Sequence, residues 1–363
     1  MSLTVLSVAY PFAPVGPDAV GGSEQILTHI DRALVAAGHT SLVIACEGSR
    51  AAGELVPVPR FSKPIQPEDM VRACRRHLRT IERVLRERPV DLIHMQGLDF
   101  YTYMPDSGPP VLVSLHLPIS WYPEGTIEPE RPHTWVHCVS ESQRRDAPAN
   151  TRMVAPIHNG VPVEELTARH AKRPFALVLA RVCPEKGIHL AIDAAKEAGV
   201  PLLIAGEVFP YEAHERYFAE EIEPRLDGTC RFLGPVGFAR KRRLLTAARC
   251  LLVPSLVPET SSLVAREAIA CGTPVVAFDR GALSETVEQG RTGFLVYDVA
   301  GMAEAIGRTG EIDPAACRAA ARERFSLETM TNSYISVYEQ IVAMKRAEAP
   351  RKRRQPRRVS LRA

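Results

Sequence analysis

The chain has 363 residues, of which 45% are hydrophobic and 24% charged, an ordinary composition for a globular protein. It is too long for one ordinary core, which predicts two domains, and no apolar run reaches the ~20 residues of a membrane span. The formal net charge is +3, but nine Lys or Arg stand against one Glu from Lys345 onward, so the preceding chain is mildly acidic. No nucleic-acid motif or basic–aromatic stripe is present, and we expect no nucleic-acid partner.

The N-terminal stretch lacks a basic region, so it predicts a first buried strand and not a signal peptide. The eight cysteines show no CxxC pairing, and several lie in or beside apolar runs. Reduced, packed thiols are therefore favoured over disulfides or a metal site, as is typical of a cytoplasmic protein.

The first half of the chain alternates apolar strands with helices. An apolar run over 3–10 is followed by a Pro- and Gly-rich loop to Gly22, a helix that ends at Gly38, and a strand over 40–46. A basic amphipathic helix over 68–88 precedes three further strands, over 90–96, 110–116 and 134–140. Apolar strands without alternation, interleaved with helices, predict a parallel sheet covered on both faces.

The alternation restarts after residue 165, so we expect an N-terminal Rossmann-like domain over 1–165 and a second one over 166–325. Helices are predicted over 187–199 and 262–271. Strands are predicted over 175–181, 201–207, 230–234, 250–255, 273–278 and 292–296. A last helix over 326–347 precedes a basic, disordered tail over 348–363. Ligands of such sheets bind beyond the carboxyl ends of the strands, and two facing domains enclose one cleft.

Two carboxylates flank the start of the helix over 262–271. Ser261 or Ser262 is placed to cap this helix, whose free N–H groups, at Leu263 and Val264, favour an anion. Glu267 lies about five residues into the helix, ~7–8 Å along its axis, which is about the distance from a diphosphate to its ribose. The spacing fits a nucleoside diphosphate, with Glu259 on the far side of the phosphates, but two glutamates eight residues apart mean little by themselves.

Glu259 and Glu267, followed by Ala-x-Ala-Cys-Gly-x-Pro-Val-Val-Ala over 268–277, resemble the signature of retaining GT-B glycosyltransferases of family 4. The resemblance covers almost the whole chain. It implies that Glu259 contacts the donor sugar, that Glu267 contacts the ribose, and that the last helix crosses back to the N-terminal domain. Ser261-Ser262 replaces the Phe-Gly that members often have, so the sugar preference does not carry over.

Two other interpretations of the paired glutamates are a surface turn followed by an amphipathic helix, and a two-carboxylate hydrolase. The hydrolase needs carboxyls ~5–9 Å apart across the bond that is cleaved. A ribose-binding Glu267 leaves Glu259 without that partner.

Two cations, Arg181 and Lys186, lie between a predicted strand end and a predicted helix. The resemblance assigns them to the leaving diphosphate, whose charge they would stabilise in the transition state. An exposed, salt-bridged loop is the alternative. The resemblance also matches His116, at a strand end, to a histidine that hydrogen-bonds the donor sugar. His94, at another strand end, is a candidate for the acceptor side.

Several glycines complete the expected site. The resemblance places Gly21 and Gly22 against the phosphate or the acceptor, and the segment 281–285, beginning at Gly281, near sugar and phosphates. Gly206 and Leu233 are expected near the nucleotide, and His-Asn-Gly-Val over 158–161 is similar to an interdomain hinge. Aromatic side chains that could stack on an acceptor are Tyr101, Tyr103, Trp121 and Tyr122.

The resemblance implies transfer of a hexosyl group from a UDP- or GDP-sugar to a small molecule, a lipid-linked sugar or a polysaccharide precursor. No Asp-x-Asp pair is present, so we expect no metal and no cofactor. The alternatives are a GT-B-like nucleotide-sugar epimerase that uses Glu259 with His116, and a non-catalytic sugar-nucleotide-binding protein. The basic tail predicts contact with anionic lipid at the inner face of a membrane, at ~1 kcal/mol per Lys or Arg, or is solvated without a function.

Overall fold

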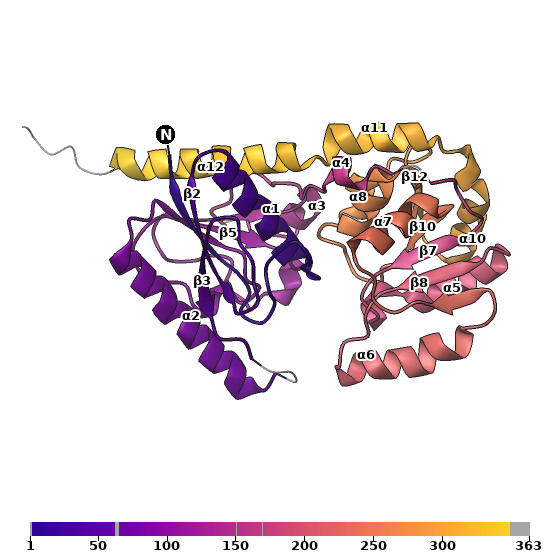
Figure 1. The fold of residues 1–363 in the computed structure, drawn as a ribbon, viewed down its shortest axis with the longest axis horizontal. Coiled ribbons are helices and arrows are strands. Elements are labelled where there is room, and N and C mark those ends of the chain that lie inside the picture. The colour runs from indigo at the N-terminus through magenta and orange to yellow at the C-terminus, as the bar shows by residue number, and fades with distance from the viewer. Residues whose placement is uncertain (1, 62–64, 150, 169, 349–363) are drawn as a thin grey trace, which may run out of the picture.

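The computed structural model describes residues 2–61, 65–149, 151–168 and 170–348. It consists of two six-stranded sheets, one in each half of the chain, and helices surround both of them (Figure 1). Within the described residues, the strands of both sheets pair in parallel throughout. The predicted α/β class with two Rossmann-like domains is therefore confirmed.

The first sheet has the strand order β3-β2-β1-β4-β5-β6. Its strands are β1 (Thr4–Val8), β2 (Thr40–Cys46), β3 (Glu54–Val58), β4 (Leu92–Met95), β5 (Val111–Leu115) and β6 (Thr134–Cys138). Helices α1 (Gly22–Ala36) and α2 (Pro67–Glu87) connect strands of this sheet. Strand β3 was not predicted because Pro57 interrupts its apolar pattern; proline is tolerated there because β3 is an edge strand.

The second sheet has the order β12-β11-β10-β7-β8-β9. Its strands are β7 (Ala176–Leu179), β8 (Leu202–Ala205), β9 (Cys230–Phe232), β10 (Cys250–Val253), β11 (Val275–Phe278) and β12 (Gly293–Val296). Its helices include α5 (Ile188–Glu197), α6 (Glu212–Tyr217), α7 (Phe238–Ala247), α8 (Leu263–Ala270), α10 (Val299–Arg308) and α11 (Pro314–Arg324). In both sheets the strand order reverses beside the first strand, between β1 and β4 in one sheet and between β7 and β10 in the other. Ligands of such sheets bind at this reversal point.

The last helix, α12 (Leu327–Glu348), lies along the N-terminal half of the chain (Figure 1). Its buried side chains Tyr334, Tyr338 and Ile341 share a core cluster with Leu3 and Leu92 of the first sheet region. The N-terminal core therefore contains residues from both ends of the described chain. The predicted basic tail lies outside the described residues, apart from Glu348.

The chain passes between the two halves twice, and the two passages lie side by side. Val161 N–H donates to the Phe325 carbonyl at 2.8 Å, and Val161 pairs with Ser326 in an isolated bridge. A side chain at Gly160 would approach the Ser326 carbonyl to 2.7 Å, so only glycine fits this crossing. The segment predicted as a hinge, 158–161, is one of these two passages.

All eight cysteines lie in the described part of the chain as free thiols; seven are buried and Cys74 is partly exposed. The predicted packing of the thiols is therefore confirmed for these seven. None of the described helices combines the length and the apolar character needed to cross a bilayer.

Candidate active site

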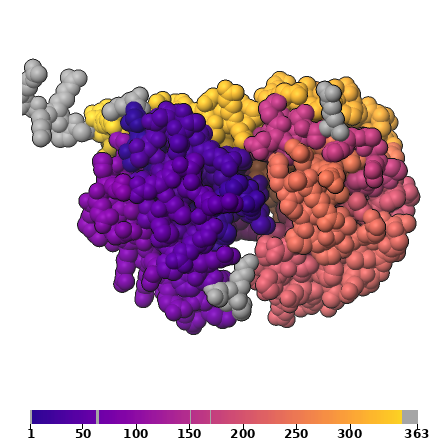
Figure 2. All heavy atoms as spheres, in the orientation of Figure 1, coloured from indigo at the N-terminus to yellow at the C-terminus, as the bar shows by residue number. Residues whose placement is uncertain are grey.

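The predicted cations and the first predicted glutamate lie on loops that follow neighbouring strands. Arg181 and Lys186 follow β7, Glu259 follows β10, and these strands pair at the reversal point of the second sheet. The Leu256 N–H donates to the Glu185 carbonyl at 2.8 Å, which ties the two loops together. A furrow separates the two halves of the molecule in Figure 2.

Lys186 and Glu259 form an ion pair at this position. Lys186 Nζ lies 2.5 Å from Glu259 Oε1, and the two side chains are 24% and 11% exposed. The Ser255 hydroxyl donates to the same carboxylate oxygen. Arg181 is exposed and makes no ion pair within the described residues, so its guanidinium is available to a ligand.

Gly281 lies against the backbone of Glu259. Its φ is +60°, and a Cβ there would come within 2.4 Å of the Glu259 carbonyl oxygen. The next residue, Ala282, donates its N–H to that oxygen at 2.7 Å. Glycine is therefore required at this position for two reasons, the left-handed conformation and the close approach.

The start of α8 differs from the expectation in one respect. Ser262 occupies the N-cap position, but its hydroxyl makes no capping hydrogen bond within the described residues. Its backbone, at φ −87° and ψ 91°, lies in the extended region that is usual for an N-cap residue. The buried Ser261 hydroxyl also lacks a hydrogen-bond partner among the described residues. The first-turn N–H groups, those of Leu263 and Val264 among them, thus receive no cap from any side chain that the structure describes.

The second predicted glutamate is also paired with a lysine. Lys241 Nζ on α7 contacts Glu267 Oε1 on α8, and the two side chains are 17% and 6% exposed. Sequence reasoning missed Lys241, because it belongs to a run of basic residues that is typical of a solvent-facing helix surface. Each signature glutamate therefore has its own cation.

The glycine pair of the N-terminal half reaches the start of α8. Gly21 is the N-cap residue of α1, and a side chain at Gly22 would lie 3.3 Å from Leu263 Cδ1. Leu263 in turn packs against the core cluster that α12 shares with the first sheet. The two halves of the chain therefore meet at the helix start that was predicted to bind phosphate.

His116 follows β5 and is joined to the loop that carries Glu259. The Thr260 hydroxyl donates to the His116 carbonyl at 2.9 Å, and His116 Nε2 lies 2.6 Å from Gln96 Oε1. Burial lowers the pKa of His116 to about 3, with a smaller contribution from His137. The imidazole is therefore neutral near pH 7 and acts through hydrogen bonds.

The structure corrects the expectation for His94. This side chain is fully buried, with Nδ1 2.6 Å from the Tyr338 hydroxyl and Nε2 2.7 Å from the Ser114 hydroxyl. His94 lies on a central strand that α12 covers, so it cannot face an acceptor. It supports the site indirectly, because the Gln96 amide bridges His94 to His116.

Of the four aromatic residues proposed for the acceptor, two are exposed and two are buried. Tyr101 and Trp121 are 39% and 49% exposed, and Tyr101 lines a hollow of about 540 Å³. Tyr103 is fully buried, with its hydroxyl bonded to Asp99, which excludes it from contact with an acceptor. The Tyr122 hydroxyl accepts from the His116 N–H at 3.0 Å, so Tyr122 holds the His116 loop.

Gly206 and Leu233 follow β8 and β9, next to the end of β7. A side chain at Gly206 would lie 1.8 Å from the Ala180 carbonyl oxygen, immediately before Arg181. The Leu233 N–H donates to the Ile204 carbonyl at 2.8 Å. Both positions therefore lie at the strand-end edge that carries the cations.

Glu285 makes a contact between the two halves that the sequence did not indicate. Its carboxylate accepts the backbone N–H groups of Glu141 and Ser142, at the start of α3 (Glu141–Arg145). A negative charge is favourable at a helix N-terminus, so this contact stabilises the observed arrangement of the halves.

Each half of the chain matches a different family model. Residues 20–165 match the model described as Glycosyltransferase Family 4, and residues 173–310 match the one described as glycosyl transferases group 1. A glycogen synthase of Mycobacterium tuberculosis is 35% identical over 47% of this chain and 43% of its own length. A D-inositol 3-phosphate glycosyltransferase of Mycolicibacterium smegmatis is 32% identical over 57% of this chain and 52% of its own length. The chain thus spans about half the length of these curated relatives.

Two solved structures share the fold over almost the whole chain. Sucrose-phosphate synthase of Thermosynechococcus elongatus has a TM-score of 0.77 at 22% identity and covers 94% of this chain and 100% of its own. Anabaena HepE, solved with UDP and glucose, has a TM-score of 0.74 at 18% identity over 93% and 99%. The two-domain arrangement is therefore the GT-B fold, as expected.

Proposed function

With both halves of the chain matching glycosyltransferase models, we propose that the protein transfers a hexosyl group from a nucleotide sugar to an acceptor with retention of configuration. The observation that carries the proposal is the Lys186–Glu259 pair at the reversal point of the second sheet. It puts a cation and a carboxylate beside the start of a helix whose N–H groups receive no side-chain cap from the described part of the chain.

The diphosphate of the donor binds between Arg181, Lys186 and the N-terminus of α8. An ammonium group has three donors, and the Lys186–Glu259 contact uses one of them, which leaves others for phosphate oxygens. When the glycosidic bond breaks, negative charge grows on the β-phosphate oxygens. Fixed cations and N–H groups stabilise that charge more in the transition state than in the ground state.

Glu267 accepts hydrogen bonds from the ribose hydroxyls, and Lys241 neutralises its charge. His116 contacts the donor sugar. Because its Nε2–H donates to the Gln96 carbonyl oxygen, the neutral ring presents Nδ1 as an acceptor for a sugar hydroxyl.

A front-face mechanism accounts for retention. Glu259 is held by Lys186 and Ser255, which makes it a poor nucleophile toward the anomeric carbon. The bond from that carbon to the diphosphate oxygen breaks while the bond to the acceptor oxygen forms on the same face. The acceptor proton passes to the departing β-phosphate oxygen, and the cations replace a metal in holding the diphosphate.

The donor is tested by thermal shift with UDP, GDP, ADP and their sugars, because a ligand that binds the folded state raises the unfolding temperature. HepE was solved with UDP and glucose, which makes UDP-glucose the first donor to test here. We expect one nucleoside diphosphate to stabilise the wild type and not Lys186→Ala. Lys196→Ala, at a lysine paired with Asp227 in the same half, is the matched control. The absence of a shift with every nucleotide would count against the proposal.

The reaction is then followed by NMR of the anomeric proton in the presence of candidate acceptors. Retention gives a product with the anomeric configuration of the donor. Conversion of the nucleotide sugar into another sugar without an acceptor would instead indicate an epimerase.

A further inference from the structure

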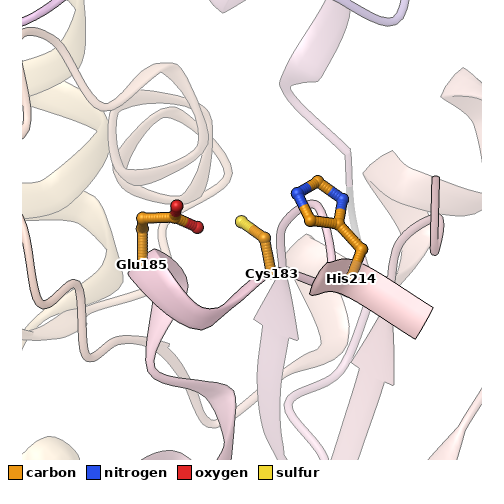
Figure 3. A group of neighbouring side chains, drawn as sticks. All are labelled: Cys183, Glu185 and His214. Carbon is orange, nitrogen blue, oxygen red and sulfur yellow. The ribbon is translucent and has the colours of Figure 1, made fainter. Parts of the chain in front are cut away.

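Three side chains that bind transition metals meet beside the cation loop. They are Cys183, Glu185 and His214, and their ligand atoms all lie within 4.8 Å of one another. Cys183 precedes the short helix η3 (Pro184–Lys186), which contains Glu185, and His214 lies on α6. Figure 3 shows the thiol between the carboxylate and the imidazole, with all three side chains on the same side of the turn.

The surroundings hold these groups in place. Cys183 is 2% exposed, and η3 packs against α6. The His214 ring packs edge-on against Tyr211, with the ring centroids 5.2 Å apart. His214 Nδ1 is a buried atom without a hydrogen-bond partner among the described residues, which is an unusual state for a buried polar atom.

We propose that Cys183, Glu185 and His214 form a binding site for Zn²⁺ or a similar borderline-soft divalent ion. Zn²⁺ binds thiolate sulfur at about 2.3 Å and imidazole nitrogen or carboxylate oxygen at about 2.0–2.2 Å. These bonds separate tetrahedral ligands by about 3.5 Å, so the group must contract by about 1 Å. Glu185 and His214 are only partly buried, and rotation of their side chains supplies this contraction.

Charge and ligand count agree with this assignment. A thiolate and a carboxylate bring two negative charges, which balance a divalent ion despite the positive charge of nearby Arg181. Three protein ligands leave one tetrahedral position open to water or to an exogenous ligand. A thiolate-containing set selects Zn²⁺ over Mg²⁺ or Ca²⁺, which prefer oxygen ligands. No CxxC pair signals the site, because its ligands come from one turn and from a helix about thirty residues later.

The site is distinct from the proposed donor site, but it lies on the same loop. The loop between Arg181 and Lys186 contains both Cys183 and Glu185, and the Cys183 thiol also contacts the Arg181 carbonyl at 3.8 Å. A bound ion would fasten this loop to α6.

The test is a Co²⁺ titration of the full chain, with an absorption readout that is independent of glycosyl transfer. We expect one equivalent to give tetrahedral d–d bands and a thiolate-to-cobalt charge-transfer band, and Zn²⁺ to displace both. Cys183→Ser should abolish the charge-transfer band, and Cys74→Ser, at the partly exposed cysteine, should leave it unchanged.

Because Cys183 is buried, Glu185→Gln and His214→Gln provide variants at less packed positions. Each should weaken Zn²⁺ binding, measured by competition with a chromophoric chelator, by about tenfold or more. A wild type that binds no stoichiometric Co²⁺ would overturn the proposal. So would a charge-transfer band that persists in Cys183→Ser, or Zn²⁺ affinities that do not change in the Gln variants.

Discussion

Lys186 Nζ lies 2.5 Å from Glu259 Oε1, and this contact joins the loop after β7 to the loop after β10. The Ser255 hydroxyl and the Gly281 segment hold the same glutamate from two other directions. The side chain of Glu259 is thus fixed before a donor binds, which reduces the entropy cost of forming the reactive complex.

Removal of the Lys186 ammonium should slow turnover strongly. We expect Lys186→Ala to lower kcat by about 10²–10³-fold, the usual effect of losing one donor to a developing charge. Lys186→Arg should not restore the rate, because a planar guanidinium cannot replace a point charge beside Glu259. The measurement is release of nucleoside diphosphate, with circular dichroism to verify folding. Unchanged turnover in a folded Lys186→Ala protein would refute the assignment of Lys186.

Glu267 should contribute to affinity through the ribose alone. We expect Glu267→Gln to weaken binding of the preferred nucleoside diphosphate by about tenfold or more, because a hydrogen bond to a charged group contributes about 1.5–3 kcal/mol. Calorimetry with the dideoxyribose analogue is the control: wild type and variant should bind it equally. Equal losses for both nucleotides would place Glu267 away from the ribose.

Gly281→Ala should destabilise the protein more than Gly199→Ala, which replaces a glycine of similar backbone conformation. Gly281 and Gly199 have φ values of +60° and +65°, but a Cβ at Gly199 meets nothing within 4 Å. Both substitutions cost the strain of the left-handed region, about 1–2 kcal/mol, and only Gly281→Ala adds a clash with Glu259. Urea unfolding of the two variants measures the difference. Equal losses in the free energy of unfolding would show that the loop around Gly281 relaxes without cost.

Tyr338 and Tyr334 provide a matched test of the buried polar network under α12. Both are fully buried, but among the described residues only the Tyr338 hydroxyl makes a hydrogen bond of ordinary geometry, to His94. We expect Tyr338→Phe to lower the free energy of unfolding by about 1–3 kcal/mol, because a buried ring nitrogen loses its partner. Tyr334→Phe should be close to neutral. A neutral Tyr338→Phe would mean that His94 finds another partner.

Most of the fold was predictable because both sheets contain nearly unbroken apolar strands. The helices α7, α10 and α11 were not predicted: the basic α7 and the Ala-rich α11 show weak periodicity, whereas α10 is as amphipathic as α1 and was overlooked. In the site, the strand-end positions of Arg181, Lys186 and Glu259 followed from their place after apolar runs. Contacts made by residues far apart in the chain, such as Lys241 with Glu267, leave no local pattern.

The misassignment of His94 has the same cause. A histidine at a strand end can face solvent or the core, and only the return of α12, more than two hundred residues later, decides between them. Tyr103 differs in that its hydroxyl is satisfied by Asp99 only four residues before it. That pairing could have been inferred, since a buried tyrosine requires a partner.

Stability should fall on mild acidification. Burial lowers the pKa of His116 to about 3 and of His137 to about 4, against about 6.5 in the unfolded chain. Below pH ~6.5 the unfolded state therefore binds protons that the folded state does not, so stability is lost as pH falls from there toward the folded pKa values. Urea unfolding between about pH 7 and 5, above the range of ordinary carboxylates, measures the slope. His137→Gln should reduce that slope, and a flat profile would contradict the prediction.

The position of α12 also bears on how the chain is made. The first sheet leaves the ribosome early, but α1 covers only part of one of its faces, and the other covering side chains belong to residues 330–342. Until these residues are synthesised, Leu3, Leu92 and Leu112 lack their contacts with α12. The N-terminal half therefore cannot complete its core while the C-terminal half is still emerging. A fragment that ends before α12 would expose this apolar face, and supplying α12 as a separate peptide would be expected to rescue it.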